Sequence, residues 1–126
     1  MRRGDASNGN GTANSWEAQL RKGCLELAIL ASLWEGPRYG LEILRVLADG
    51  SDLQVAEGTL YPILARLKAD GMLRSEWVEA EAGHPRKYYR LEPAGRRRTR
   101  EMAEAWRAFS SNVSTVIDPV FKGAGK

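Results

Sequence analysis

Apolar residues recur every three or four positions through three segments in the first half of this chain, which is the spacing of one helix face. The pattern predicts helices over residues 15–34, 39–48 and 57–71. The first segment is apolar over most of its circumference, which is typical of a central, buried helix. Ser15 is a favourable N-cap, and the Gly-Pro pair that follows Trp34 two residues later ends this helix.

The third segment has an unusual polar side for a short amphipathic helix. Surface helices usually carry Glu, Lys and Gln there, but this one carries Gly58, Thr59, Tyr61, Pro62 and Arg66. Small residues let a backbone approach a DNA groove closely, and Tyr and Arg side chains can reach phosphates. The alternative is that Gly58 and Pro62 belong to a loop and that Tyr61 is a half-buried packing residue.

The place of Pro62 in this helix is open at the level of sequence. If Thr59 is the N-cap, Pro62 takes the third helical position, where a missing N–H costs no hydrogen bond. If the helix begins near Glu57, Pro62 lies inside it and bends it, and Gly58 reduces the steric clash.

After Gly71 the period of the apolar positions changes to two. Residues 72–80 and 86–92 alternate like strands, and the Gly and Pro between them indicate a turn, so they predict a β-hairpin. A helical spacing returns over residues 93–117. Its apolar residues recur in the a/d spacing of a coiled coil: Met102, Trp106, Phe109, Val113 and Val116.

Together these elements predict a mainly α fold with a small β-hairpin (α+β), namely a winged helix-turn-helix followed by a C-terminal dimerisation helix. We expect a disordered arm over residues 1–14, a DNA-binding domain over 15–92, the dimerisation helix over 93–117 and a flexible tail over 118–126.

Composition narrows the function classes. Nineteen basic against sixteen acidic side chains give a net charge of +3, which permits a nucleic-acid partner. The single cysteine, Cys24, excludes an internal disulfide and fits a cytoplasmic protein. One histidine and one cysteine leave no catalytic triad or metal cluster, and no Gly-rich phosphate loop is present, so we expect neither an enzyme nor a cofactor. No segment is long and apolar enough to indicate a membrane partner.

The predicted hairpin carries a basic tip. His84, Arg86, Lys87 and Tyr88 lie on or beside the turn, where they suit salt-dependent contacts with phosphates. A solvated charge cluster is the alternative. The tryptophan in the first hairpin strand, Trp77, is expected to pack where the helices meet the wing.

Three stretches of this sequence resemble the PadR family of bacterial transcriptional regulators. They are "LASLWEGPRYGLEIL", "GTLYPILARLKADGML" and "GHPRKYYRLEPAG", and the resemblance spans residues 20–109. It implies a homodimeric winged-helix regulator, usually a repressor, which binds an inverted-repeat operator in double-stranded DNA and is released by an effector. The short last helix resembles the subfamily with a single C-terminal helix.

By this resemblance the chain's DNA contacts are Tyr39, Thr59, Tyr61 and Arg66 in the helix-turn-helix and Arg86, Lys87 and Tyr88 in the wing. The dimer arm is represented by Met102, Trp106, Phe109 and Val113. Two departures from the family pattern leave details open. Glu92 replaces the usual N-cap of the last helix, and His84 with Pro85 alters the wing tip.

Trp106 is the expected contact of a small aromatic effector, because family members that sense flat molecules stack them on a tryptophan near this position. Glu26, a carboxylate within the apolar first helix, is a second candidate for a cationic ligand. Plain packing of Trp106 and simple exposure of Glu26 are the alternatives. For the whole chain, the rival function is a winged-helix module for protein contacts, and such modules usually lose the basic wing that this chain keeps.

Overall fold

The computed structural model describes residues 4–51, 53–80 and 83–122, with only the backbone described over residues 4–14 and at residue 51. The predictions for residues 1–3 and 123–126 therefore lie outside the described residues. The described residues form four helices and three strands in chain order: α1 (Gly4–Ser32), β1 (Arg38–Tyr39), α2 (Gly40–Ser51), α3 (Glu57–Ala69), β2 (Leu73–Val78), β3 (Arg86–Leu91) and α4 (Pro93–Lys122).

The core lies where the C-terminal half of α1 meets α2, α3 and the sheet. Leu60, Leu64 and Leu67 form the apolar stripe of α3, and none of the three is more than 1% exposed. They pack in one cluster with Ile29 and Leu30 of α1, which are both fully buried. The apolar spacing thus predicted the inward faces of α3 and of the C-terminal half of α1 correctly, because burying such a stripe stabilises a short helix. Residues 15–23 of α1 were expected to belong to a buried helix but are exposed, with Leu20 at 49%, because this part of α1 projects from the body.

The hairpin is confirmed, and it gains a third strand that the sequence pattern did not predict. The strands run antiparallel in the order β1-β3-β2. Tyr39 in β1 lies opposite Tyr88 in β3, while Leu73 in β2 lies opposite Leu91. Because two residues are too few to show alternation, β1 leaves no period of its own in the sequence.

The helix α3 begins at Glu57, which decides between the two possibilities for Pro62. The residue before the helix, Ala56, is extended and supplies no side-chain cap. Pro62 therefore lies inside the helix and cannot donate to the carbonyl of Gly58, four residues earlier. The helix persists around Pro62 because its apolar stripe is fully packed.

Both terminal helices extend beyond their predicted ends. Residues 4–14, expected as an arm without structure, belong to α1, and residues 118–122, expected in a tail, belong to α4. Extending an existing helix by one residue costs far less than nucleating a new one, so a firmly packed segment can continue into residues of low helix propensity. Pro119 lies near the C-terminal end of α4.

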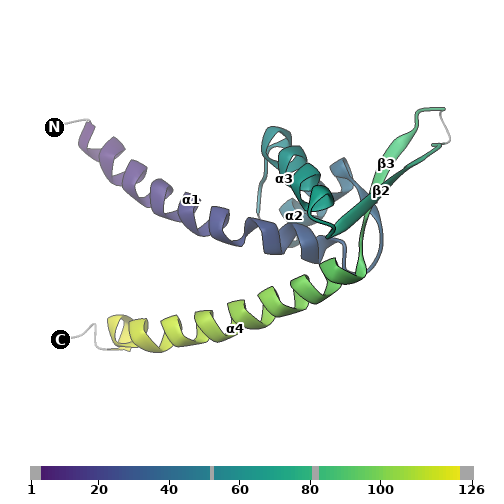
Figure 1. Cartoon of the computed structure of the whole chain (residues 1–126). Helices are drawn as coiled ribbons and strands as arrows, with labels where there is room; N and C mark the ends of the chain where they lie inside the picture. The colour runs from purple at the N-terminus through teal and green to yellow at the C-terminus, as the bar shows by residue number, and fades with distance from the viewer. Residues whose placement is uncertain (1–3, 52, 81–82, 123–126) are drawn as a thin grey trace.

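The overall shape is a small body with three projections (Figure 1). The N-terminal part of α1 and the C-terminal part of α4 leave the body on one side as two separate arms, and the β2–β3 hairpin leaves it on the opposite side. This separation sets apart two candidate surfaces, one on the hairpin and α3 and one on the arms.

Candidate nucleic-acid and dimer interfaces

Tyr61 joins the exposed side of α3 to the start of α2. Its ring packs against the backbone of Gly40, where an added Cβ atom would overlap the Tyr61 hydroxyl group. Tyr61 is still 40% exposed. Burial raises the pKa of the neighbouring Tyr89 above its ordinary value of 10.0, and the proximity of Tyr61 adds to that rise. Tyr61 was interpreted from the sequence either as a DNA contact or as a half-buried packing residue. The structure is compatible with both, because part of the side chain packs and part of it stays exposed.

Thr59 lies exposed in the first turn of α3, at the edge of a hollow of about 250 Å³. The opposite wall of this hollow carries Arg21 and Lys22 of α1. These two cations were not predicted as site residues from the sequence, because their closeness to α3 depends on how α1 packs. They add positive charge beside the N-terminal end of α3.

Arg66 lies on the side of α3 that faces α1, and it is already paired. Its Nη2 atom is 3.1 Å from Oε1 of Glu26, and its Nη1 atom is 3.7 Å from Oδ2 of Asp70. The other carboxylate oxygen of Glu26 lies 3.8 Å from Nε of Arg98 in α4. Glu26 thus sits between α3 and α4, and both predicted site residues, Glu26 and Arg66, have protein partners.

The outer face of the sheet brings together three of the predicted DNA contacts. The guanidinium carbon of Arg86 lies 4.5 Å from the centre of the Tyr39 ring. The rings of Tyr39 and Tyr88 meet edge to face, with 5.4 Å between their centres. The Tyr39 backbone N–H donates a hydrogen bond to Oε1 of Glu42, which ties this cluster to α2. Tyr39, Arg86 and Tyr88 therefore form one aromatic and cationic surface.

Lys87 points to the opposite, inner face of the sheet. Its Nζ atom lies 5.8 Å from the centre of the Trp77 ring and 5.9 Å from that of Tyr89. His84 is exposed in the loop before β3. The prediction that Trp77 is a packing residue is wrong, because Trp77 is 66% exposed near the end of β2.

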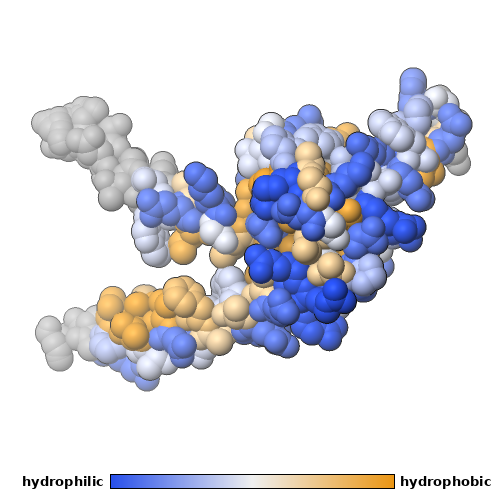
Figure 2. Space-filling view, in the orientation of Figure 1, coloured by the Kyte–Doolittle hydropathy of each residue, from blue (hydrophilic) through white to orange (hydrophobic). Residues whose placement is uncertain are grey.

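The predicted dimer residues lie along one arm. Met102 packs partly against the core, and Nε1 of Trp106 donates a hydrogen bond of 3.0 Å to Sγ of Cys24 in α1. Farther along α4, Phe109 is 69% exposed, and apolar side chains continue past the predicted end of the helix. Figure 2 shows this apolar surface on the side of α4 that faces α1. The large apolar residues of α4 that are exposed are Trp106, Phe109, Val113, Val116, Ile117, Val120 and Phe121.

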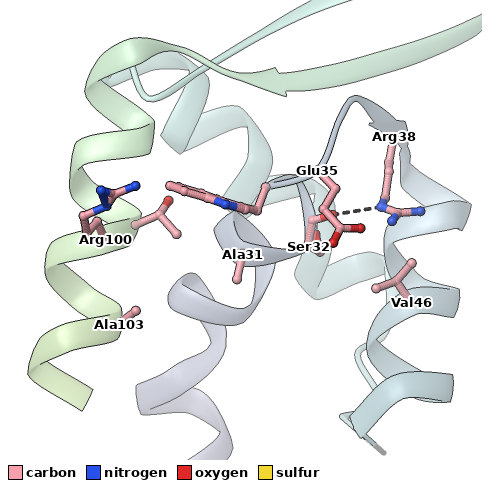
Figure 3. Close-up of a pocket in the computed structure, with 9 residues that line it drawn as sticks. Ala31, Ser32, Glu35, Arg38, Val46, Arg100 and Ala103 are labelled. Atoms are coloured by element: carbon pink, nitrogen blue, oxygen red, sulfur yellow. Dashed lines mark hydrogen bonds between the residues drawn. The ribbon is translucent and has the colours of Figure 1, made fainter. Parts of the chain in front are cut away.

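A cleft of about 520 Å³ opens between the end of α1, α2 and α4 (Figure 3). Trp34 lines it, and the guanidinium carbons of Arg96 and Arg100 lie 4.3 Å and 5.3 Å from the centre of the Trp34 ring. Arg38 closes the other side of the cleft and donates a hydrogen bond from Nε to the Ser32 carbonyl oxygen. This cleft was not predicted from the sequence, because its lining comes from segments far apart in the chain.

Two absences concern only the part of the chain that the structure describes. Within it, no cluster of three or more His, Cys, Asp or Glu side chains has the arrangement needed to hold a metal ion. Within the same residues, no helix combines the length and the apolar character of a membrane-crossing segment.

Comparison with known proteins gives a consistent answer. Residues 29–101 match the profile of the transcriptional regulator PadR-like family. Among solved structures, a PadR family transcriptional regulator from Eggerthella lenta is 33% identical, with a TM-score of 0.79 over 88% of this chain and 96% of that one. A PadR-like transcription factor from Bacteroides fragilis is 40% identical, with a TM-score of 0.66 over 81% of this chain and 98% of that one. The transcriptional regulator Rv3488 of Mycobacterium tuberculosis is 54% identical over 43 residues, which are 34% of this chain and 39% of that protein.

Proposed function

Because this chain belongs to the PadR-like family of transcriptional regulators, we propose that it binds an inverted-repeat operator as a homodimer and represses transcription until a small effector releases it. A regulator of this kind is not an enzyme, and its surfaces for DNA and for the second copy must lie on each protomer. The proposal therefore assigns one task to α3 with the hairpin and another to α4.

The observation that carries the DNA assignment is the continuous chain of contacts from α3 to the wing. Tyr61 of α3 packs on Gly40, and the preceding residue, Tyr39, packs against Tyr88 and Arg86 of the hairpin. A helix that enters the major groove and a wing that follows the backbone need a fixed spacing between them. These contacts support that spacing.

Each proposed DNA contact has a distinct chemical role. Thr59 and Tyr61 lie near the N-terminal end of α3, the end that helix-turn-helix proteins usually turn toward base edges. Four wing residues supply cationic or hydrogen-bonding groups for phosphates: His84, Arg86, Lys87 and Tyr88. Arg66 is expected to contribute least, because it must first leave the carboxylates of Glu26 and Asp70.

The homodimer assignment rests on the uncovered apolar face of α4. Phe109, Val116 and Phe121 are 69%, 76% and 74% exposed, which is unusual for three large apolar side chains on one helix. A second copy packed on this face would remove them from water. The resulting twofold symmetry would present two copies of α3, which matches an inverted repeat in the DNA.

Trp106 is the proposed effector contact. It lies where α4 meets α1 and is 47% exposed, so one side of the ring remains open to a flat aromatic molecule. Glu26 is a weaker candidate, because a cationic ligand must displace Arg66 or Arg98 from its carboxylate.

Fluorescence anisotropy of a labelled duplex tests the proposed function. The duplex covers the DNA just upstream of the chain's own gene and is titrated with full-length protein at two salt concentrations, beside a scrambled duplex. We expect the upstream duplex to bind more tightly than the scrambled one, with two protomers on each operator. Its affinity should fall at the higher salt concentration. Equal and feeble binding to both duplexes would favour a winged-helix module that contacts proteins.

A further inference from the structure

Trp77 is the most exposed aromatic residue of the hairpin, with 66% of its surface open to water. The register of the sheet places it directly opposite Lys87. The two side chains share one face of the hairpin, and the Lys87 ammonium group lies 5.8 Å from the centre of the indole ring. One face of the hairpin therefore carries an exposed indole ring and an ammonium group side by side.

This face is the continuation of the sheet's inner face. Strand alternation places Trp77 on the same side as Leu73, and Leu73 is 2% exposed because it packs into the core. Tyr89 on β3 lies on this side too and is 7% exposed. The hairpin extends beyond the body (Figure 1). Trp77, near the end of β2, has the same orientation as Leu73 but is 66% exposed.

The core does not require the indole ring in this position. Trp77 is outside the buried cluster and outside the set of partly buried apolar residues that pack against it. A large apolar ring left in water forgoes the stabilisation that burial would give it. Such a residue is best explained by a partner that covers it.

We propose that Trp77 is a DNA-contacting residue of the wing, whose indole ring packs on deoxyribose groups at the edge of the minor groove while Lys87 pairs with a neighbouring phosphate. The inference deepens the proposed function and rests on it. Charge complementarity selects a nucleic acid as the occupant, because the Lys87 ammonium group lies on this face beside the indole ring, and Arg86 is exposed on the other face of the same hairpin. Apolar side chains against sugars and unstacked steps are a common way of holding the minor groove.

A contact of this kind adds affinity without reading bases. The sugars present the same surface whatever the sequence, so the loss of the ring should weaken operator and scrambled duplexes by a similar factor. Lys87 differs in this respect, because the loss of one phosphate contact also reduces the dependence of affinity on salt.

The test compares three full-length variants by anisotropy with operator and scrambled duplexes: Trp77→Ala, Trp77→Phe and Val78→Ala. Val78 is the matched control, because it is an exposed apolar neighbour, 39% exposed, on the other face of the same strand. We expect Trp77→Ala to weaken both duplexes by about five- to tenfold, with an unchanged salt slope. Trp77→Phe should lose about twofold or less, and Val78→Ala should match the wild type.

A second measurement separates DNA contact from support of the hairpin. Titration with duplex should change the tryptophan emission of the wild type, and the Trp77→Phe protein, which retains an aromatic ring, should lack a large part of that change. Wild-type affinity in Trp77→Ala, or an equal emission change in both proteins, would overturn the assignment while the proposed function stands. If the wild type binds no duplex at all, both fail together.

Discussion

Close packing beside the helix-turn-helix depends on single residues. Gly40 is the clearest case, because its missing Cβ leaves the space that the Tyr61 ring occupies. Gly58, by contrast, has nothing within 4 Å of the position a Cβ would take. The two glycines look alike in the sequence, and only their surroundings in the fold show that one is required for close packing.

A pair of glycine substitutions tests this difference. Gly40→Ala should destabilise the protein by about 1–3 kcal/mol, because the new methyl group forces Tyr61 away from α2. Gly58→Ala should leave the free energy of unfolding unchanged or raise it by about 0.5–1 kcal/mol, since glycine is a poor helix residue. Thermal and urea unfolding measure both. Equal effects of the two substitutions would contradict the packing of Tyr61 on Gly40.

The DNA contacts themselves are tested by Tyr61→Ala and Lys87→Ala. Each should weaken operator binding, because part of the Tyr61 side chain stays exposed on α3 and Lys87 would supply a phosphate contact from the wing. Anisotropy measures the affinity, and light scattering verifies that the oligomeric state is the same as that of the wild type. Wild-type affinity in both variants would remove the contact assignment.

Among the secondary-structure elements, α3 and α4 are linked through Glu26 of α1. Its carboxylate reaches Arg66 of α3 at 3.1 Å and Arg98 of α4 at 3.8 Å. The two arginine side chains are 53% and 50% exposed, so water screens both pairs. Partly exposed pairs of this kind are worth about 0–1 kcal/mol each, and their effect on the charge available to DNA is the larger consequence.

Glu26→Gln should therefore change DNA affinity more than stability. The free energy of unfolding should change by about 1 kcal/mol or less. DNA affinity should rise, because Arg66 becomes free to approach phosphates. Glu101→Gln, an equal change of charge on the exposed side of α4, is the control for net charge. Weaker DNA binding by Glu26→Gln would contradict this explanation and indicate that the pair with Arg66 holds α3 in place.

The arm formed by α4 is tested through Trp106. Trp106→Ala removes a large ring from the proposed dimer face and its hydrogen bond to Cys24, so the dimer dissociation constant should rise. The loss should amount to a few kcal/mol at most, in line with other large-to-small changes (about 3–5 kcal/mol for fully buried rings). Analytical ultracentrifugation measures it, with Trp77→Ala as the control for loss of an exposed tryptophan. An unchanged dissociation constant would place the interface elsewhere.

Elements long enough to repeat their apolar residues could be predicted from the sequence, and shorter ones could not. The inward stripes of α1, α2 and α3 repeat often enough to be found, and so does the alternation of β2 and β3. The two-residue strand β1 is too short for any period. The start of α1 was predicted too late and the end of α4 too early, because residues of low helix propensity there suggested irregular chain, whereas both helices continue from packed segments.

The candidate site was predictable in part for a related reason. Strand alternation places Trp77 on the same side of β2 as the buried Leu73. It does not show how far along the strand that side is covered by the core. Packing was therefore expected where the structure shows an exposed ring. The partners of Arg66 and the closeness of Arg21 and Lys22 to α3 depend on contacts between distant segments, which no local pattern contains.

The whole molecule separates the two proposed interfaces in space. The hairpin and the arms leave the body on opposite sides (Figure 1), so a second copy can cover α4 without touching the wing. A dimer built in this way would hold two copies of α3 at a spacing set by the arms. The symmetry of the DNA site is then a property of the whole assembly and of no single residue.

Selection of binding sites from a random duplex library is the most direct test of whether the protein binds DNA as a sequence-specific dimer. Full-length protein captures duplexes at moderate salt over several rounds, and the recovered sequences are aligned. The account predicts an enriched inverted repeat whose half-sites lie about one helical turn, or a multiple of it, apart. Recovery of sequences without any common motif, or of a single unrepeated half-site, would contradict a dimeric, sequence-specific regulator.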